Sequence, residues 1–156
     1  MFKTLYFSMK YWDYLLRTLK SNCPFCDVDE NFVIDKSKTF SVILARAPYV
    51  KDHLLIIPDR HIVRLWEIST DEWTDLVKLV KKWVKKIEEF HDEVNLLLRD
   101  WVADGIIWKS IDHLHFHLVP DVPFYYWKAW WRERKIFSDF EYSKLTREFK
   151  DHCWLK

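Results

Sequence analysis

The stretch SIDHLHFHLVPD, residues 110–121, places three of the chain's seven histidines two residues apart. His113, His115 and His117 alternate with apolar residues, which is the period of a β-strand, whose successive side chains point to opposite faces. The three imidazoles therefore share one face. Because histidine titrates near neutral pH, such a row suits metal binding, proton transfer or nucleophilic attack. The alternative is a half-buried strand that carries histidines by chance. Chance would then have to place all three on one face of a strand that ends at Pro120.

The composition is that of one globular domain without a global charge bias. The chain has 156 residues, of which 49% are hydrophobic, and this is enough to bury a core. Its 25 basic and 24 acidic residues leave a formal net charge of +1, so a site for phosphate must be local, and nucleic acid is not an expected partner. Charges interrupt residues 1–16, which lack a secretory core and a membrane-length apolar run. We therefore expect a soluble, cytoplasmic protein with no membrane partner.

Short β-rich runs predict an antiparallel sheet. Residues 94–100 form one such run, which we expect to pair with the histidine stretch as a hairpin with a long loop. Three further runs come earlier, at residues 31–36, 39–45 and 53–58.

Helical spacing indicates one long helix and two shorter ones. Ser69 and Glu72 form a capping box that opens the long helix. Its expected apolar stripe contains Trp73, Leu76, Val77, Val80, Val84 and Ile87. Residues 10–22 and 140–150 show the same spacing, so shorter helices are expected near both ends.

Two of the three cysteines, Cys23 and Cys26, stand in the sequence CPFC. Three cysteines make a poor disulfide framework, so this pair is a candidate for metal binding or for redox chemistry. A redox pair should open a helix after a strand, whereas here the helical spacing comes before and β-rich sequence follows. Metal binding is therefore favoured, with a thiol-disulfide oxidoreductase as the alternative.

The histidine row, the segment HLLIIPDRHI (residues 53–62) and CPFC occur in an order that resembles the histidine triad (HIT) family, in its zinc-containing branch. The resemblance extends from Cys23 to Pro120. It implies an α+β fold, with an antiparallel sheet, one long helix and short terminal helices, as a single domain over residues 1–156. Residues 1–22 would form an N-terminal helical extension and residues 121–156 a C-terminal tail.

The resemblance also implies a catalytic site. In that family the middle histidine is the nucleophile, which is His115 here, and it attacks the α-phosphorus of a nucleotide to form a covalent nucleotidyl-histidine. His117, Ser110 and Lys109 would bind the phosphate. Lys109 occupies a position that is often glutamine in the family, and Ser110 has the alternative role of a local turn hydrogen bond. The expected function is a nucleotide hydrolase or transferase acting on a nucleotide or nucleotide conjugate, and the expected assembly is a homodimer.

The same resemblance assigns a structural zinc ion to Cys23, Cys26, His61 and His113. All four ligands of such a Cys2His2 set come from the protein, which leaves no open position for catalysis. The alternative function is therefore a zinc-stabilised nucleotide-binding protein with little turnover.

Two positions depart from the family pattern. Ala45 stands where many members have an aspartate that binds the ribose hydroxyls, and Arg99 stands where an asparagine is common. Arg99 has two candidate roles: it binds a phosphate, or it forms a surface ion pair with Asp100.

The chain contains one glycine and ten tryptophans. Ordinary glycine usage of about 7% predicts roughly eleven glycines in a chain of this length. Trp101 follows the strand run that ends at Asp100, and Trp108 precedes Lys109 near the expected phosphate site. Glycine suits both places better, because it takes positive φ or approaches a phosphate without a Cβ penalty. We hypothesise that the source gene reads UGA as glycine. The alternative is a truly tryptophan-rich protein, and Trp73 or Trp83, on the apolar side of the long helix, is a candidate for a genuine tryptophan, because glycine within a helix costs about 1 kcal/mol relative to alanine.

Overall fold

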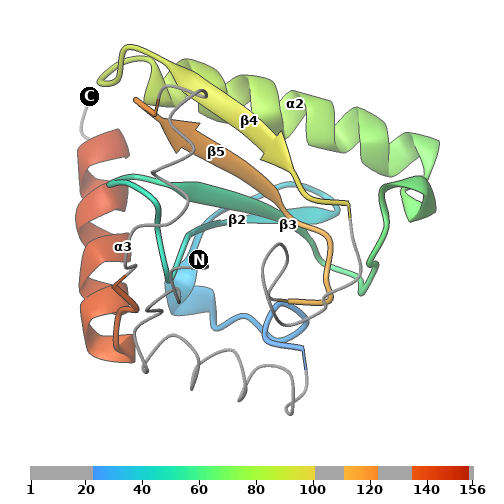
Figure 1. The fold of residues 1–156 in the computed structure, drawn as a ribbon, viewed down its shortest axis with the longest axis horizontal. Coiled ribbons are helices and arrows are strands. Elements are labelled where there is room, and N and C mark those ends of the chain that lie inside the picture. The colour runs from blue at the N-terminus through green and yellow to red at the C-terminus, as the bar shows by residue number, and fades with distance from the viewer. Residues whose placement is uncertain (1–22, 101–110, 123–134, 155–156) are drawn as a thin grey trace, which may run out of the picture.

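The computed structural model describes residues 23–100, 111–122 and 135–154, which build a sheet with helices against it (Figure 1). The sheet is antiparallel and has five strands in the order β1-β2-β3-β5-β4. This arrangement confirms the expected α+β class. The helix expected at residues 10–22 lies outside the described residues. The strands are β1 (Val33–Lys36), β2 (Phe40–Leu44), β3 (Leu54–Pro58), β4 (Val94–Leu98) and β5 (Phe116–Pro120).

Strand β5 lies inside the sheet, between β3 and β4. His117 is paired with Leu55 of β3 on one side and with Leu97 of β4 on the other. The expected hairpin of β4 with the histidine strand is therefore confirmed. The strand itself begins at Phe116, so His113 and His115 lie in the segment that leads into it.

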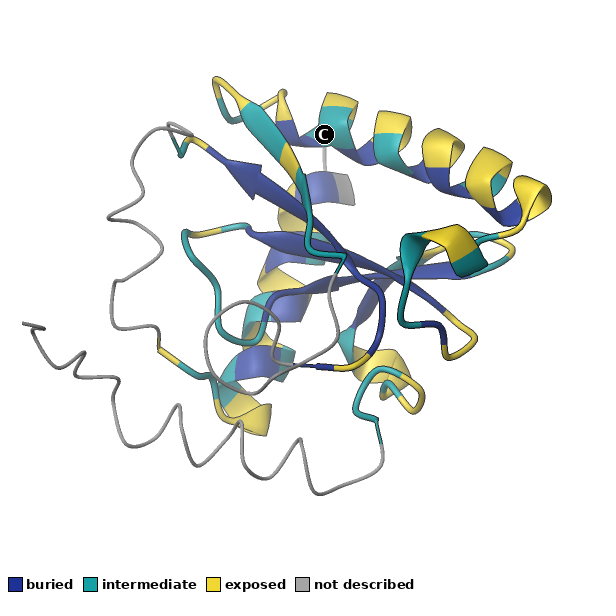
Figure 2. Cartoon of the chain, turned by 45° about the vertical axis from the view of Figure 1, so that its right-hand side comes forward, coloured by how far each residue is buried: buried dark blue, intermediate teal, exposed yellow. Residues whose placement is uncertain are grey.

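The apolar face of the sheet is covered by α2 (Thr70–Ile87), which begins at the expected capping box. Its buried apolar side chains are Leu76, Leu79, Trp83 and Ile87, whereas Trp73 and Val77 of the expected stripe are 47% and 42% exposed. The expected stripe is confirmed at Leu76 and Ile87, which are buried, and at Val80 and Val84, which pack against the same core. It was wrong at Trp73 and Val77, because adjacent positions differ by about 100° around a helix and cannot both face the sheet. Figure 2 shows the resulting division of α2 into a buried side and an exposed side.

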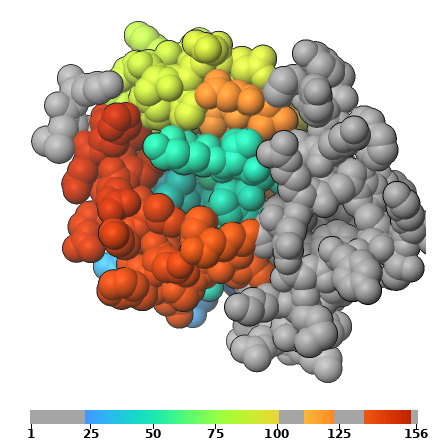
Figure 3. All heavy atoms as spheres, turned by 60° about the vertical axis from the view of Figure 1, so that its left-hand side comes forward, coloured from blue at the N-terminus to red at the C-terminus, as the bar shows by residue number. Residues whose placement is uncertain are grey.

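Helix α3 (Asp139–Trp154) extends the expected terminal helix at both ends. Its Phe149 ring stacks with Trp83 of α2 at 6.1 Å between centroids. The segment before it is tied to the β2–β3 loop, because the amide of Phe137 donates to the carbonyl of Arg46 at 3.2 Å. Figure 3 shows α3 (red) and that segment (orange) beside the loop (turquoise). Short 3-10 turns, η1 (Glu30–Phe32) and η2 (Leu65–Glu67), complete the described elements.

Among the residues that the structure describes, no helix combines the length and the apolar character that crossing a membrane requires.

Candidate functional site

The three histidines of the row lie on the face of the sheet opposite α2, and all three are buried, with exposed fractions of 0% for His113 and 7% for His115 and His117. Leu114 and Phe116 between them enter the core shared with α2. The alternation predicted from the sequence is therefore present, although only His117 belongs to a strand.

Hydrogen bonds to the backbone fix the protonated nitrogen of two of these imidazoles. The Nδ1 of His115 lies 2.7 Å from the carbonyl oxygen of His113, and the Nε2 of His113 lies 2.9 Å from the carbonyl oxygen of Pro58. A carbonyl only accepts, so each of these nitrogens donates a proton. In the neutral rings, the lone pair of His115 is then on Nε2 and that of His113 is on Nδ1.

A fourth histidine, His53, orients His117. The backbone amide of Tyr49 donates to the Nδ1 of His53 at 3.2 Å, so a neutral His53 carries its proton on Nε2. This Nε2 lies 2.9 Å from the Nδ1 of His117 and donates to it. The remaining nitrogen of His117, Nε2, is therefore a donor. The chain of hydrogen bonds begins at a backbone amide and ends at a nitrogen that can stabilise a negative charge.

From the sequence we expected His53 to be a packing residue at the start of a strand, with orientation of the nucleotide pocket as the alternative, and its hydrogen bonds match the alternative. Its exposed fraction is 2%, and it shares the histidine face because Leu55, two residues on, pairs with His117. The alternation of β3 carries the signal, but only once β3 is known to neighbour β5.

His53, His115 and His117 form one wall of a cavity of about 290 Å³. Such a volume is near the lower end of the range for small-molecule sites. Most of the remaining wall is apolar and includes Phe25, Val28, Phe32, Ile43, Leu55 and Ile111. A cavity with an apolar wall and three convergent imidazoles suits a ligand that has both a flat apolar part and a polar, reactive part.

Charged residues stand at the side of the cavity near α3. Arg46 forms an ion pair with Asp139, the first residue of α3. Its guanidinium lies over the rings of Phe32 and Tyr142, at 5.5 Å and 5.0 Å from their centroids. All four residues line the cavity, so this side combines aromatic surface with paired charges.

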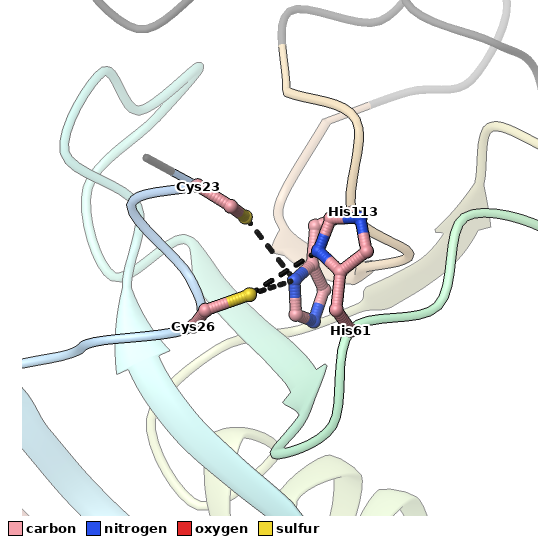
Figure 4. A group of neighbouring side chains, drawn as sticks. All are labelled: Cys23, Cys26, His61 and His113. Carbon is pink, nitrogen blue, oxygen red and sulfur yellow. Dashed lines mark hydrogen bonds between the residues drawn. The ribbon is translucent and has the colours of Figure 1, made fainter. Parts of the chain in front are cut away.

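Cys23, Cys26, His61 and His113 come together at one point, as Figure 4 shows. One ligand atom from each lies within 4.8 Å of all the others. The two cysteines share a turn closed by the bond from the amide of Cys26 to the carbonyl of Cys23, His61 follows β3, and His113 precedes β5. The structure thus brings the four predicted ligands together from three separate segments.

The dimensions of this cluster fit a tetrahedral metal site. The Nδ1 of His113 lies 3.3 Å and 3.6 Å from the Sγ atoms of Cys23 and Cys26, and the Nδ1 of His61 lies 3.2 Å from the Sγ of Cys26. A tetrahedral zinc ion with ordinary bond lengths separates its sulfur and nitrogen ligands by about 3.6 Å. The bond from the Nε2 of His113 to Pro58 also directs the Nδ1 lone pair into the cluster, as an outer hydrogen bond does in metal sites.

The cysteine pair does not have the surroundings of a redox dithiol. It lies in a turn followed by η1 and β1, and not at the start of a helix. The pKa of Cys26 is raised to about 11, first by desolvation and second by the neighbouring Cys23 thiol. A redox cysteine that attacks as a thiolate needs a lowered pKa instead. Metal binding must displace that proton, so metal affinity is expected to rise with pH.

Two predicted phosphate contacts, Ser110 and Lys109, lie outside the described residues, and so do Trp101 and Trp108.

The comparison with family models matches residues 27–123 to the HIT domain. This protein belongs to the HIT domain family. HIT relatives include the adenosine 5'-monophosphoramidase of Schizosaccharomyces pombe, which is 29% identical over 103 residues, covering 64% of this chain and 74% of the relative. The asymmetrical bis(5'-nucleosyl)-tetraphosphatase of the same organism is 29% identical over 119 residues, covering 74% of this chain and 58% of the relative.

Solved HIT structures share the fold. A hypothetical histidine triad nucleotide-binding protein from Sulfolobus tokodaii has a TM-score of 0.62 at 25% identity, covering 84% of this chain and 91% of its own. A zinc-bound histidine triad family protein from Mycobacterium smegmatis has a TM-score of 0.55 at 17% identity, covering 92% and 93%.

Proposed function

We propose that this HIT protein is a nucleotide hydrolase or nucleotidyl transferase that cleaves an α-phosphate bond, with His115 as the nucleophile. The observation that carries the proposal is the 2.7 Å bond from the Nδ1 of His115 to the carbonyl of His113, which leaves the Nε2 lone pair for attack. His115 also lines the cavity, so a bound phosphate can reach it. The relatives named as phosphoramidase and tetraphosphatase support hydrolysis of nucleotide conjugates.

The reaction proceeds in two displacements. The Nε2 of His115 forms a bond to the α-phosphorus, and the leaving group departs with the electron pair of the bond that breaks. Water, or another acceptor in a transferase, then displaces the histidine and restores its lone pair. During both steps the Nε2–H of His117 donates to a phosphoryl oxygen, and His53 holds His117 in the tautomer that can donate. Ser110 and Lys109 remain predicted phosphate contacts.

We infer that Cys23, Cys26, His61 and His113 hold a structural zinc ion. The cluster dimensions and the zinc-bound relative support this identity of the metal. A bound zinc ion would supply cross-linking and no chemistry, because the protein provides all four ligands. Those ligands connect the turn at Cys23 to the segment that carries His115, two residues beyond His113.

We also infer a homodimer that acts in the cytoplasm. Strand β4 is an edge of the sheet, and its Leu96 is 50% exposed. An apolar side chain on an open edge favours pairing with a second chain. The single-domain organisation over residues 1–156 stays a prediction.

A trapped adduct tests the proposed chemistry. The protein is mixed with adenosine or guanosine 5'-phosphoramidate, quenched in milliseconds and analysed by intact mass and peptide mapping. We expect a nucleotidyl adduct on His115, and we expect none in His115→Ala. His152→Ala is the matched control, because His152 is an exposed histidine of α3 whose ring contacts Phe90. Nucleotide binding without adduct or turnover in the wild type would instead establish a zinc-stabilised binding protein.

A further inference from the structure

His91, in the connection between α2 and β4, lies between two carboxylates. Its Nδ1 lies 2.6 Å from the Oδ2 of Asp121, and its Nε2 lies 3.1 Å from the Oδ2 of Asp52. A carboxylate only accepts, so both ring nitrogens donate, as they do in a protonated imidazole. The side chains of His91 and Asp52 are only 13% and 16% exposed, so water screens their contact less than it screens a surface ion pair. None of these three residues lines the catalytic cavity.

The two acidic partners of His91 share an uncommon backbone conformation. Asp52 has a φ of 61° and Asp121 a φ of 51°, and no other non-glycine residue in the part of the chain that the structure describes has a positive φ. Aspartate enters this left-handed region more readily than most residues, but the conformation still has an energetic cost that the surroundings must offset. Because both residues are bonded to one imidazole, His91 is placed to hold the two bends.

The bends at Asp52 and Asp121 lie at one end of the sheet. Leu54 at the start of β3 pairs with Leu118 near the end of β5, so the chain enters β3 beside the point where it leaves β5. The carboxylate of Asp121 also accepts from the backbone amide of Asp92 at 3.0 Å. The imidazole therefore ties the entry to β3 to a point that a second hydrogen bond fixes.

The β2–β3 loop, residues 45–53, carries the groups that orient His53. The amide of Ala45 donates to the carbonyl of His53 at 2.8 Å and closes the loop. The amide of Tyr49 donates to the Nδ1 of His53 at 3.2 Å, and the Tyr49 ring stacks on the imidazole at 4.9 Å between centroids. Asp52 lies between these two residues in the sequence, directly before His53. A change of φ at Asp52 would therefore move Tyr49 relative to His53.

We propose that His91 is a positioning residue for the catalytic histidines. By bonding both carboxylates it holds the β2–β3 loop against the end of β5, and Tyr49 then keeps His53 in the orientation that donates to His117. This inference rests on the proposed function, in which His117 donates to a phosphoryl oxygen. Because His91 lies outside the cavity, its loss should lower kcat and leave KM unchanged.

Hydrogen exchange of the Tyr49 amide measures the position of the loop without any catalysis. His91→Phe keeps a flat ring but removes both bonds to the carboxylates. It should speed exchange of the Tyr49 amide about tenfold, because a charged hydrogen bond contributes a factor of about ten or more to such an equilibrium. The amide of Leu114, which donates to the carbonyl of Ile62 at 2.7 Å within the core, should keep its wild-type rate. Equal acceleration of the two amides would show that His91 only stabilises the fold.

Two variants of Asp52 give the same test without changing the histidine, and they decide it if His91→Phe does not fold. Asp52→Ala removes the carboxylate and should speed the Tyr49 amide as His91→Phe does. Asp52→Asn should keep the wild-type rate, since asparagine tolerates positive φ and its side-chain oxygen still accepts from His91. The matched control is His152→Phe, because the ring of His152 on α3 contacts Phe90, as the ring of His91 does. An unchanged Tyr49 amide in His91→Phe or Asp52→Ala would overturn the proposal.

Single-turnover rates on adenosine 5'-phosphoramidate test the link to catalysis. In His91→Phe the rate should fall by up to about tenfold, the loss expected for His53→Phe, with KM unchanged. In a His53→Phe background, His91→Phe should cost little further activity, because both act through the same donor. Equal losses in both backgrounds would overturn the positioning role. If the wild type shows no turnover, the proposed hydrolysis fails, whereas exchange of the Tyr49 amide still decides whether His91 holds the loop.

Discussion

Replacing His53 with phenylalanine tests whether the hydrogen-bond chain to His117 contributes to catalysis. The variant keeps a flat ring but removes the bond accepted from the amide of Tyr49 and the bond donated to the Nδ1 of His117. Each buried hydrogen bond contributes about 1 kcal/mol, so we expect a loss of about 2 kcal/mol in unfolding free energy. Without the bond from His53, His117 populates both tautomers, and the one that carries its proton on Nδ1 cannot donate from Nε2.

The expected effect on rate has an upper limit. Removing one donor to a developing negative charge lowers the rate by about 10²–10³, which is the loss expected for His117→Ala. His53→Phe leaves His117 in place with a mixture of tautomers, so its loss in kcat should be smaller, about tenfold. His53→Gln should recover part of the rate, because an amide nitrogen of glutamine can donate to His117 as the Nε2 of His53 does.

A double-mutant cycle, with rates measured in single turnovers, gives the decisive result. If His53 acts through His117, then His53→Phe should cost little further activity in a His117→Ala background. The same tenfold loss in both backgrounds would refute the reasoning and return His53 to a packing role. Circular dichroism and thermal melts of each variant separate misfolding from the loss of the donor.

Three further predictions follow from other parts of the chain. Purified protein should contain about one zinc ion per chain. Either Cys26→Ser or a chelator should lower the melting temperature, since the metal binds only the folded state. A protein that contains no metal and whose melting temperature a chelator does not change would contradict the site. The pKa of Glu72 is lowered to about 2, chiefly by its hydrogen bond from Arg60, so its carboxylate stabilises the fold above about pH 4.5 and loses this contribution as the pH falls toward 2. In Glu72→Gln the melting temperature should therefore change less between pH 4.5 and pH 2 than it does in the wild type. An equal change in both proteins would show that another group is responsible. Codon sequencing and native peptide masses at Trp101 and Trp108 should reveal UGA and glycine, whereas UGG codons or tryptophan masses would reject the altered code.

The histidine face could be predicted because it depends only on the alternation of side chains along one strand. His113, His115 and His117 alternate with Leu114 and with other apolar residues, and this suffices to sort them onto one side. The contribution of His53 could not be predicted in that way, since its partner is set by the order of strands in the sheet, which is a tertiary property.

The helix α2 and the metal cluster show two further limits of prediction from the sequence. The capping box fixed the start of α2, but apolar residues at adjacent positions, such as Leu76 and Val77, did not reveal which one faces the sheet. For the metal, the spacing identified the cysteine pair alone. The family resemblance selected His61 and His113 from the other histidines, and the structure brings them to the pair.

The burial of Trp83 indicates that at least one of the ten tryptophans is genuine and not a mistranslated glycine. Trp83 is 1% exposed, and its Nε1 donates to Asp35 at 2.8 Å. Glycine there would leave a large cavity in the core and remove one of the two donors to Asp35, the other being the Nζ of Lys82 at 2.7 Å. Trp66 is 75% exposed, so packing does not argue for an indole at that position.

The position of β5 inside the sheet determines when the molecule can become complete during synthesis. His53 and His117 are 64 residues apart in the sequence, and at about 5–20 residues per second the ribosome needs about 3–13 s to reach the second after the first. For most of that interval the nascent chain contains Cys23, Cys26 and His61, whereas β3, and later β4, lack the partner that belongs between them. Their open edges are where a chaperone, or a second nascent chain on the same messenger, would compete with β5 for pairing.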